Sequence, residues 1–269
     1  TNDDRLMREH PVEIAEGIKL LMRAVGVDKA IVGIEENKPQ AIQAMQRATY
    51  NDKNIEIAIL KAKYPQGSEK QLIQALIHRE VPSGALPVAV GAIVQNVATA
   101  YAVQRAVRFG QPLMERVVTV TGPDVKTPGN YLVALGTSLA DVIELAGGMP
   151  QDTGKVILGG PMMGRAASVI ETPTTKGVSG VLMLPESESH RAQVQPCIRC
   201  ARCVSVCPMG LEPYLIATLS RLDRYEDAAA EKLMDCVECG SCSYTCPSYR
   251  PILDYIRLGK TKIRALNYG

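Results

Sequence analysis

Cysteine is confined to one stretch of this chain and recurs there at regular intervals. All eight cysteines lie between residues 197 and 246, where they form two runs of four. Each run reads C-x-x-C-x-x-C-x-x-x-C-P, a spacing typical of paired cubane 4Fe-4S clusters in which the fourth cysteine of each run binds the other run's cluster. We therefore predict one cluster on Cys197, Cys200, Cys203 and Cys246, and a second on Cys236, Cys239, Cys242 and Cys207.

The repeated spacing has a physical reason. Three cysteines at three-residue intervals allow a short loop to curl around one cubane with backbone N–H groups directed at its sulfides, while a fourth cysteine reaches the neighbouring cluster. Pro208 and Pro247 follow the fourth cysteines and turn the chain away, because the proline ring fixes φ. We therefore expect the two runs to form one pseudo-symmetric unit.

The sequence leaves two other roles for these cysteines open, zinc binding and a disulfide framework. Zinc sites typically use two C-x-x-C pairs, or one pair with histidines, and need neither a third cysteine at the same interval nor the C-P ending. A disulfide framework would imply an oxidising compartment, which fits a cysteine-free stretch of 196 residues poorly. Iron–sulfur chemistry is favoured. A brown protein would support it, and a colourless zinc protein would contradict it.

The composition is that of an ordinary globular chain. The 269 residues are 46% hydrophobic and 22% charged, which allows two or three small domains. A net charge of +2 gives no indication of nucleic-acid binding. No apolar run reaches the ~18 residues of a membrane span, so we expect a soluble chain.

Short apolar strands alternate with amphipathic helices in the first part of the chain. Helices are predicted at 11–25 and 38–48, where apolar residues recur at three- and four-residue steps. Apolar strands are predicted at 29–35 and 55–62. This alternation favours βαβ units and a parallel sheet, whose ligands bind where the strands end.

Two helix starts in this region could bind an anion. Gly67 lies in a turn after the second strand, and Ser68 can cap the helix that follows. A strand-like stretch at 92–95 leads to Asn96 at the N-cap of a helix that ends near Phe109. Exposed N–H groups and the helix dipole favour a phosphate at such positions. The alternative is that Asn96 and Ser68 only cap their helices, as such residues usually do.

Residues 113–184 have a different pattern, with several short strands around one helix. Paired strands are predicted at 115–122 and 131–137, and Ser138 begins the helix. This pattern indicates a small α+β module. Its turn GGPMMG lacks the Walker spacing and the Lys-Ser/Thr ending, so we interpret it as structural rather than phosphate-binding. The polar stretch 185–195 that follows is predicted to be a linker.

Helices accompany the cysteine runs. Between the runs, helices are predicted from Pro213 to Leu222 and from Tyr225 to Met234, and a basic amphipathic segment ends the chain. This last segment either packs on the cluster domain with a solvated basic face or contacts a membrane, and it has too few charges for a firm lipid anchor. The basic residues are Arg257, Lys260, Lys262 and Arg264.

The chain as a whole resembles a known family. The motifs that carry the resemblance are YPQGSEKQL, REVPSGALP, VQNVATA and PLMERVVTVTG, followed by the two cysteine runs. Together they resemble the C subunit of the Rnf complex, an ion-translocating ferredoxin:NAD oxidoreductase, and more distantly the flavin-bearing NADH subunit of respiratory complex I. The resemblance implies a multidomain α/β and α+β fold, with a Rossmann-like FMN/NADH-binding domain at 1–112, a β-grasp (SLBB) domain at 113–184, a linker at 185–195 and a two-cluster bacterial ferredoxin-like domain at 196–269.

The resemblance also implies which residues bind FMN. In the complex I relative, a Y-x-x-G-E-E segment and an N-N-V-E-T segment contact the flavin. Gly67 and Glu69 match the first segment, where Ser68 replaces one acid, and Asn96 and Thr99 match the second. These five residues are therefore expected to bind FMN, with Glu69 as the catalytic residue near the isoalloxazine and nicotinamide. The family's glycine-rich loop, which completes the FMN pocket, is expected upstream of residue 1.

The function implied is that of an electron-transfer subunit in a translocase. Electrons would pass through two 4Fe-4S clusters to or from FMN and NAD(H). The partners implied are integral Rnf subunits, the iron–sulfur B subunit and, indirectly, ferredoxin, with peripheral attachment at the cytoplasmic face of the membrane. Two alternatives stay open: a cobalamin reductase-like protein of bacterial microcompartments, which shares this architecture, and a bare iron–sulfur relay without nucleotide chemistry.

Overall fold

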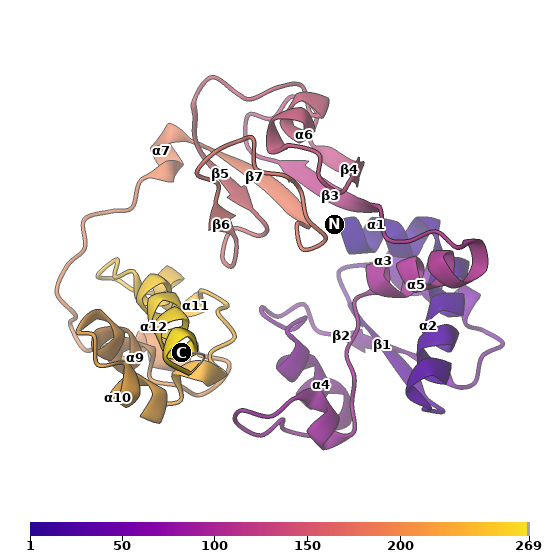
Figure 1. The fold of residues 1–269 in the computed structure, drawn as a ribbon, viewed down its shortest axis with the longest axis horizontal. Helices are drawn as coiled ribbons and strands as arrows, with labels where there is room; N and C mark the ends of the chain where they lie inside the picture. The colour runs from indigo at the N-terminus through magenta and orange to yellow at the C-terminus, as the bar shows by residue number, and fades with distance from the viewer. Residues whose placement is uncertain (268–269) are drawn as a thin grey trace. The chain divides into compact units, whose positions relative to one another are not determined.

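A computed structural model of the chain describes residues 1–267, which fold into two compact units (Figure 1). The first unit comprises residues 1–80, 90–160 and 164–189. The second comprises the chain from residue 190 onward together with two short segments, 81–89 and 161–163.

The first unit begins with a βαβ arrangement. Strands β1 and β2 pair in parallel with Ala30 opposite Ile55, and helix α3 connects them. This confirms the predicted parallel sheet, which has two strands within the described residues. Its elements are α1 (Asn2–Glu9), α2 (Pro11–Val25), β1 (Ala30–Glu35), α3 (Pro39–Ala48) and β2 (Ile55–Leu60).

Helices α4 (Glu69–Ile77) and α5 (Val97–Phe109) follow β2, with a 3-10 turn, η1 (Pro87–Val90), between them. The strand predicted at 92–95 is wrong, because this stretch has no regular structure. A strand needs a partner, and within the described residues β1 and β2 pair only with each other. Ile93 is 54% exposed, so the apolar pattern that suggested a strand reflects no burial.

Helix α5 is held tightly against α2. Gly17 lies so close to α5 that a side chain there would collide with the carbonyl oxygen of Ala100. Polar groups beside this contact join the same helices, since Gln104 donates to Glu16 (Nε2–Oε2 2.9 Å) and Arg108 pairs with Glu16. The start of α5 therefore has a well-defined position in the first unit.

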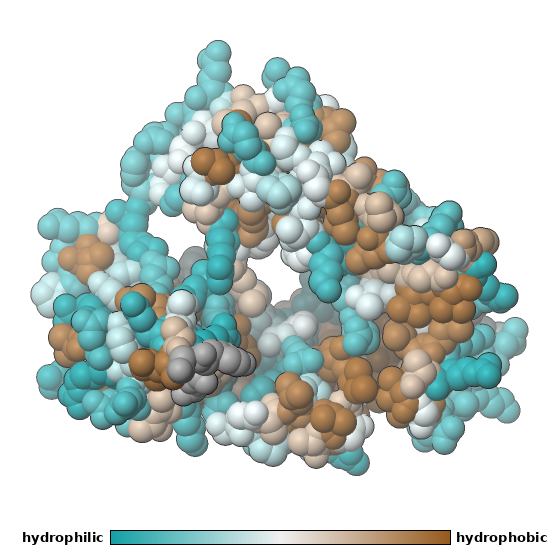
Figure 2. Space-filling model, viewed as in Figure 1, coloured by the Kyte–Doolittle hydropathy of each residue, from teal (hydrophilic) through white to brown (hydrophobic). Residues whose placement is uncertain are grey.

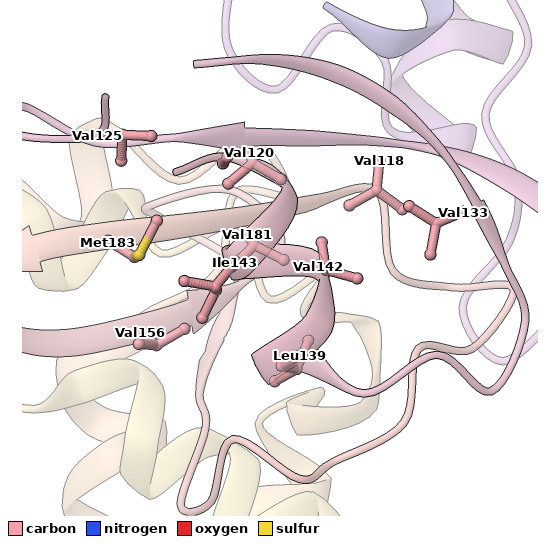
Figure 3. Packing of buried hydrophobic residues seen from close by; sticks show 11 residues of the cluster. Val118, Val120, Val125, Val133, Leu139, Val142, Ile143, Val156, Val181 and Met183 are labelled. Atoms are coloured by element: carbon pink, nitrogen blue, oxygen red, sulfur yellow. The ribbon is translucent and has the colours of Figure 1, made fainter. Parts of the chain in front are cut away.

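The rest of the first unit is a mixed five-stranded sheet covered by one helix. The strand order is β4-β3-β7-β5-β6; β3 and β7 are parallel and the other pairs antiparallel. Valines of β3 and β7 face Leu139, Val142 and Ile143 of α6 in one hydrophobic core (Figure 3). The predicted hairpin and helix are confirmed. The elements are β3 (Glu115–Thr121), β4 (Gly129–Ala134), α6 (Leu139–Leu145), β5 (Thr153–Leu158), β6 (Arg165–Ala166) and β7 (Gly180–Pro185).

The stretch predicted as a linker is partly folded. Residues 186–189 form a short helix, α7 (Glu186–Ser189), that was not predicted from the sequence. Ser189 is buried, and the ammonium of Lys155 donates to its carbonyl oxygen. From residue 190 to 196 the chain is exposed and forms neither helix nor strand.

The second unit is helical and contains both cysteine runs. Its core is formed by Ile216, Leu233, Ile252 and Ile256, with Cys203 and Cys242 in the same cluster. The predicted helices are confirmed, although the second between the runs is shorter than expected. The elements are α8 (Arg202–Ser205), α9 (Pro213–Arg221), α10 (Tyr225–Ala230), the 3-10 turn η2 (Leu233–Asp235), α11 (Ser241–Tyr244) and α12 (Ile252–Asn267).

Among the described residues, no helix is both long and apolar enough to cross a membrane. Hydrophobic residues gather on the visible face of the first unit over α2 and the neighbouring β1 (Figure 2). Exposed apolar side chains there include Val27 at 44% and Ile31 at 37%. Helix α4 covers part of this face of the sheet, because Leu72 and Leu76 lie beside Gly33, whereas Ile31 stays exposed.

Candidate iron–sulfur and flavin sites

The two cysteine runs have equivalent backbone conformations. In each run the third and fifth residues have positive φ, an uncommon conformation for residues other than glycine. Alternation of this kind curls the chain and brings successive N–H groups to one side, as in anion-binding nests. The residues are Arg199 (56°) and Ala201 (56°) in the first run, and Glu238 (55°) and Gly240 (82°) in the second.

The equivalence continues through the helix after each curl. The amide of Ser205 donates to the carbonyl of Ala201 (3.1 Å), and Tyr244 donates to Gly240 in the same way (3.1 Å). It extends past the C-P pairs, where Gly210 and Tyr249 both have positive φ. The predicted pseudo-symmetry is therefore confirmed.

A pocket in the second unit brings together cysteines from both runs. Its lining includes Cys207, Cys236, Cys239 and Cys242, the four residues predicted to bind one cluster. Apolar side chains from α9 and α12 complete the walls, among them Ile216 and Ile256. The crossing of Cys207 into the second run therefore has direct geometric support, and the thiol set fits a 4Fe-4S cubane.

The thiol electrostatics of the second run agree with this grouping. Burial, followed by the negative charges of Cys236 and Cys239, raises the pKa of the Cys242 thiol to about 12, and Cys207 acts in the same direction. Burial also raises the pKa of Cys236, although the amide of Glu238, which donates to its sulfur (3.4 Å), opposes this. Because iron binds thiolates, loading this site must release protons.

The first run is more open. Cys197 and Cys200 are exposed, Cys203 is buried and Cys246 is half-buried. Burial raises the pKa of the Cys203 thiol, and the charge of Cys246 contributes to the same rise. Cys246 therefore lies within electrostatic range of the first run, which supports the reciprocal crossing.

None of the eight cysteines forms a disulfide. Within residues 1–267, no group of three or more His, Cys, Asp or Glu side chains converges closely enough to hold a single metal ion. A cubane has a different requirement, since each thiolate binds a separate iron.

A partly buried charge cluster lies beside the second run. Lys260 of α12 is 5% exposed, and its ammonium donates to the carbonyl of Cys236 (2.5 Å) and to Oε1 of Glu238 (3.1 Å). Arg257 donates to Oε2 of Glu238 (3.0 Å) and to the carbonyl of Met163 (2.7 Å). Burial would raise the pKa of Glu238, but hydrogen bonds and charge from Lys260 and Arg257 hold it below its ordinary value.

Lys260 was predicted to lie on a solvated basic face, and this was wrong. The helical spacing of the sequence indicates that Lys260 is buried, because it is four residues after Ile256 and three before Ile263, which are both buried. A lysine on the apolar stripe of a helix must be paired or must reach solvent. Here it is paired.

The predicted flavin residues at α5 form a cap. Oδ1 of Asn96 accepts from the amide of Ala98 (2.8 Å), and its Nδ2 donates to Oδ2 of Asp3 (2.8 Å). Thr99, in the first turn, is half-buried. The capping role of Asn96 is therefore observed, and a carboxylate lies at the helix start where a phosphate was predicted.

The predicted flavin residues at α4 are accessible. Gly67 has open space where a Cβ would project, Ser68 is the N-cap residue without a side-chain capping bond, and Glu69 is exposed at the first helical position. A cleft of about 660 Å³ elsewhere in the first unit is lined by α1, α5, β3 and β4, and none of the five predicted residues lines it. Their contacts with FMN remain a prediction.

Comparison with family models divides the chain into three matched regions. Residues 1–105 match the Nuo51 FMN-binding domain, residues 117–166 the SLBB domain, and residues 189–247 the 4Fe-4S dicluster domain. These matches confirm the predicted multidomain fold class and indicate FMN and 4Fe-4S clusters as cofactors.

The similar solved structures support the same fold. The chain matches an NAD+-reducing [NiFe]-hydrogenase in the H2-reduced state with a TM-score of 0.63 and 21% identity, over 98% of this chain and 53% of that one. At this identity the likeness concerns the fold.

Curated relatives match nearly the whole chain. The C subunit of the proton-translocating ferredoxin:NAD(+) oxidoreductase complex of Clostridium ljungdahlii is 47% identical over 266 residues, which is 98% of this chain and 58% of the relative. The C subunit of the Na(+)-translocating complex of Acetobacterium woodii is 43% identical over 98% of this chain and 60% of the relative. The C subunit of an ion-translocating oxidoreductase complex of Rhodobacter capsulatus is 44% identical over 87% and 45%.

The chain thus spans about half the length of the curated relatives it matches. The order of the three matched regions agrees with the order of the sequence motifs. This chain belongs to the family of C subunits of ion-translocating ferredoxin:NAD(+) oxidoreductase (Rnf) complexes.

Proposed function

We propose that this protein relays electrons between a membrane-associated partner and NAD(H), through two 4Fe-4S clusters and FMN, as part of an ion-translocating ferredoxin:NAD oxidoreductase. The observation that carries the proposal is the pocket where Cys207 joins Cys236, Cys239 and Cys242. The names of the relatives support it and favour this function over a microcompartment cobalamin reductase.

The ligands of each cluster follow from the crossed pairing. One cluster is bound by Cys197, Cys200, Cys203 and Cys246, and the other by Cys236, Cys239, Cys242 and Cys207. The division into an FMN domain at 1–112, an SLBB domain at 113–184 and a cluster domain at 196–269 belongs to the same proposal.

Iron–sulfur clusters carry single electrons, and a flavin couples them to the two-electron chemistry of a nicotinamide. The chain's own contribution is to hold and shield these groups. Apolar residues of α9 and α12 keep water from the second run, and the curled backbone directs N–H groups toward the sulfur atoms.

The flavin is proposed to bind at the two helix starts. Asn96 and Thr99 hold its phosphate at the amino end of α5, where a ligand anion would compete with the carboxylate of Asp3. Gly67 and Ser68 allow the ligand to approach α4 closely, because the space beside Gly67 is open. Glu69 is the catalytic residue near the isoalloxazine and nicotinamide.

The partners are proposed to be other subunits of the complex. These are integral membrane subunits and the iron–sulfur B subunit, which exchanges electrons with ferredoxin. Attachment at the cytoplasmic face of the membrane would be through protein contacts, in keeping with a basic helix that buries Lys260 rather than presenting it to lipid.

The test is an Asn96→Ala, Thr99→Ala double variant of the full-length protein. Loss of a hydrogen bond to a charged group costs about 1.5–3 kcal/mol, and the double variant removes two, so FMN affinity should fall at least about 100-fold. Iron content should not change. NADH-driven bleaching of the cluster absorbance should slow in proportion to flavin loss.

A matched control separates flavin binding from helix capping. Ser138 caps α6 by accepting from the amide of Asp141 (3.1 Å), so Ser138→Ala removes a cap of the same unit without touching the proposed flavin site. FMN content should be unchanged in this control. Unchanged FMN in the double variant would return Asn96 and Thr99 to a capping role, and wild-type clusters that NADH never reduces would favour the bare relay.

A further inference from the structure

The charge cluster of Glu238, Arg257 and Lys260 has no equivalent in the first cysteine run. The runs are related by a constant offset of 39 residues, the difference between Cys236 and Cys197. This offset pairs Glu238 with Arg199 and Lys260 with Arg221, and both arginines are exposed. The curled backbone forms in both runs, so the curl does not itself require the charge cluster.

The cluster places a fixed positive charge beside the second run. Its two cations and one carboxylate sum to a single positive charge, and the ammonium of Lys260 contacts the carbonyl of Cys236 directly. Glu238 lies between two ligand cysteines and anchors both cations through separate oxygens. Because Lys260 is buried, its charge is little screened by water.

A cubane held by four thiolates is anionic and gains a further negative charge on reduction. A nearby positive charge therefore stabilises the reduced state more than the oxidised state, and local charge is one of the factors that sets cluster potentials. We propose that Lys260, held by Glu238, is a positioning residue that raises the reduction potential of the second cluster selectively. This inference rests on the proposed ligand set of that cluster.

The charge account predicts shifts of opposite sign for two variants. Lys260→Met removes a positive charge, so the potential of the second cluster should fall. Glu238→Gln removes a negative charge, so the same potential should rise. Lys260→Arg keeps the charge and should restore most of the wild-type value, whereas the potential of the first cluster should stay constant throughout.

The measurement is a redox titration of the full-length protein followed by electron paramagnetic resonance, with iron content determined on each sample. Lys262→Met is the matched control, because Lys262 is exposed on the same helix two residues away. This control should leave both potentials unchanged. A wild-type protein without a second cluster would refute the ligand set itself, which is distinguishable from a failure of the charge effect.

Two results would overturn the inference while the ligand set stands. One is an unchanged potential of the second cluster in Lys260→Met at full iron content. The other is a shift of the same sign in Lys260→Met and Glu238→Gln, which would indicate a loosened loop rather than a charge effect. If Lys260→Met loses the second cluster, the inference is tested by Glu238→Gln alone. In that variant the reduction potential of the second cluster must rise.

Discussion

The two cysteine runs have equivalent backbones and contrasting surroundings. Both curl through the same pattern of positive φ, yet Cys197 and Cys200 of the first run are exposed, whereas their equivalents in the second, Cys236 and Cys239, are half-buried and buried. The spacing of ligands thus determines the local curl, while packing from distant parts of the chain determines the environment. One ligand motif can therefore give two centres of different stability and potential.

The difference arises from what covers each run. An exposed segment without helix or strand precedes the first run. The second is covered by α12 and by the segment 161–163, part of the GGPMMG turn, whose Met163 carbonyl accepts from Arg257. The turn was interpreted as structural, and this contact agrees with that interpretation.

The largest expected effect that separates the runs is selective loss of one cluster. Limited oxidation of the reconstituted protein should release about half of the iron in a fast phase, because the thiolates of the first run are more accessible than those of the second. Iron release and electron paramagnetic resonance would follow the two phases. Loss of both clusters in a single phase would show that the difference in exposure has no consequence.

A smaller effect is expected at the fifth position of the runs, where the first has Ala201 and the second Gly240. In Gly240→Ala, a Cβ would meet the carbonyl oxygen of Met162 at 2.5 Å, at a φ of 82°. We expect a loss of about 1–3 kcal/mol in the free energy of unfolding, measured by denaturant titration. Ala201→Gly should change it by less than about 1 kcal/mol. Equal effects at both positions would contradict the proposed asymmetry.

The smallest effect is expected where the helices that follow the two runs meet. Ser220 of α9 packs against Gly259 of α12, an equivalent position, and its hydroxyl is buried without a hydrogen-bond partner. Removing such a group in Ser220→Ala should raise the free energy of unfolding by about 1 kcal/mol. Ser205→Ala, whose exposed hydroxyl donates to Arg202, should have a smaller effect. A clear loss of stability in Ser220→Ala would reveal a partner for this hydroxyl.

Features encoded by local spacing could be predicted from the sequence. The helix at 11–25 and the hairpin of β3 and β4 were predicted because their apolar periodicity is strong and continuous. The spacing also predicts that Cys207 joins the second run, because it limits the reach of a loop; the pocket that these cysteines line supports this grouping, which stays a prediction. The flavin residues were assigned by resemblance, and their contacts remain a prediction.

Features that depend on distant partners could not be predicted. The apolar stretch 92–95 reads as a strand, but no described strand is available to pair with it. Lys260 reads as a surface charge until Glu238 and the carbonyl of Cys236, more than 20 residues earlier, are brought beside it. Helix α7 is a third example. Its polar sequence indicates a linker, but in the folded chain the ammonium of the distant Lys155 donates to the carbonyl of Ser189.

The most direct test of the paired-run account is a reciprocal pair of variants, Cys207→Ala and Cys246→Ala, with each cluster identified by its spectrum and potential. Cys207→Ala should damage chiefly the cluster of Cys236, Cys239 and Cys242, whereas Cys246→Ala should damage the cluster of the first run. If each variant instead loses the cluster of its own run and keeps the other, the crossed pairing is wrong.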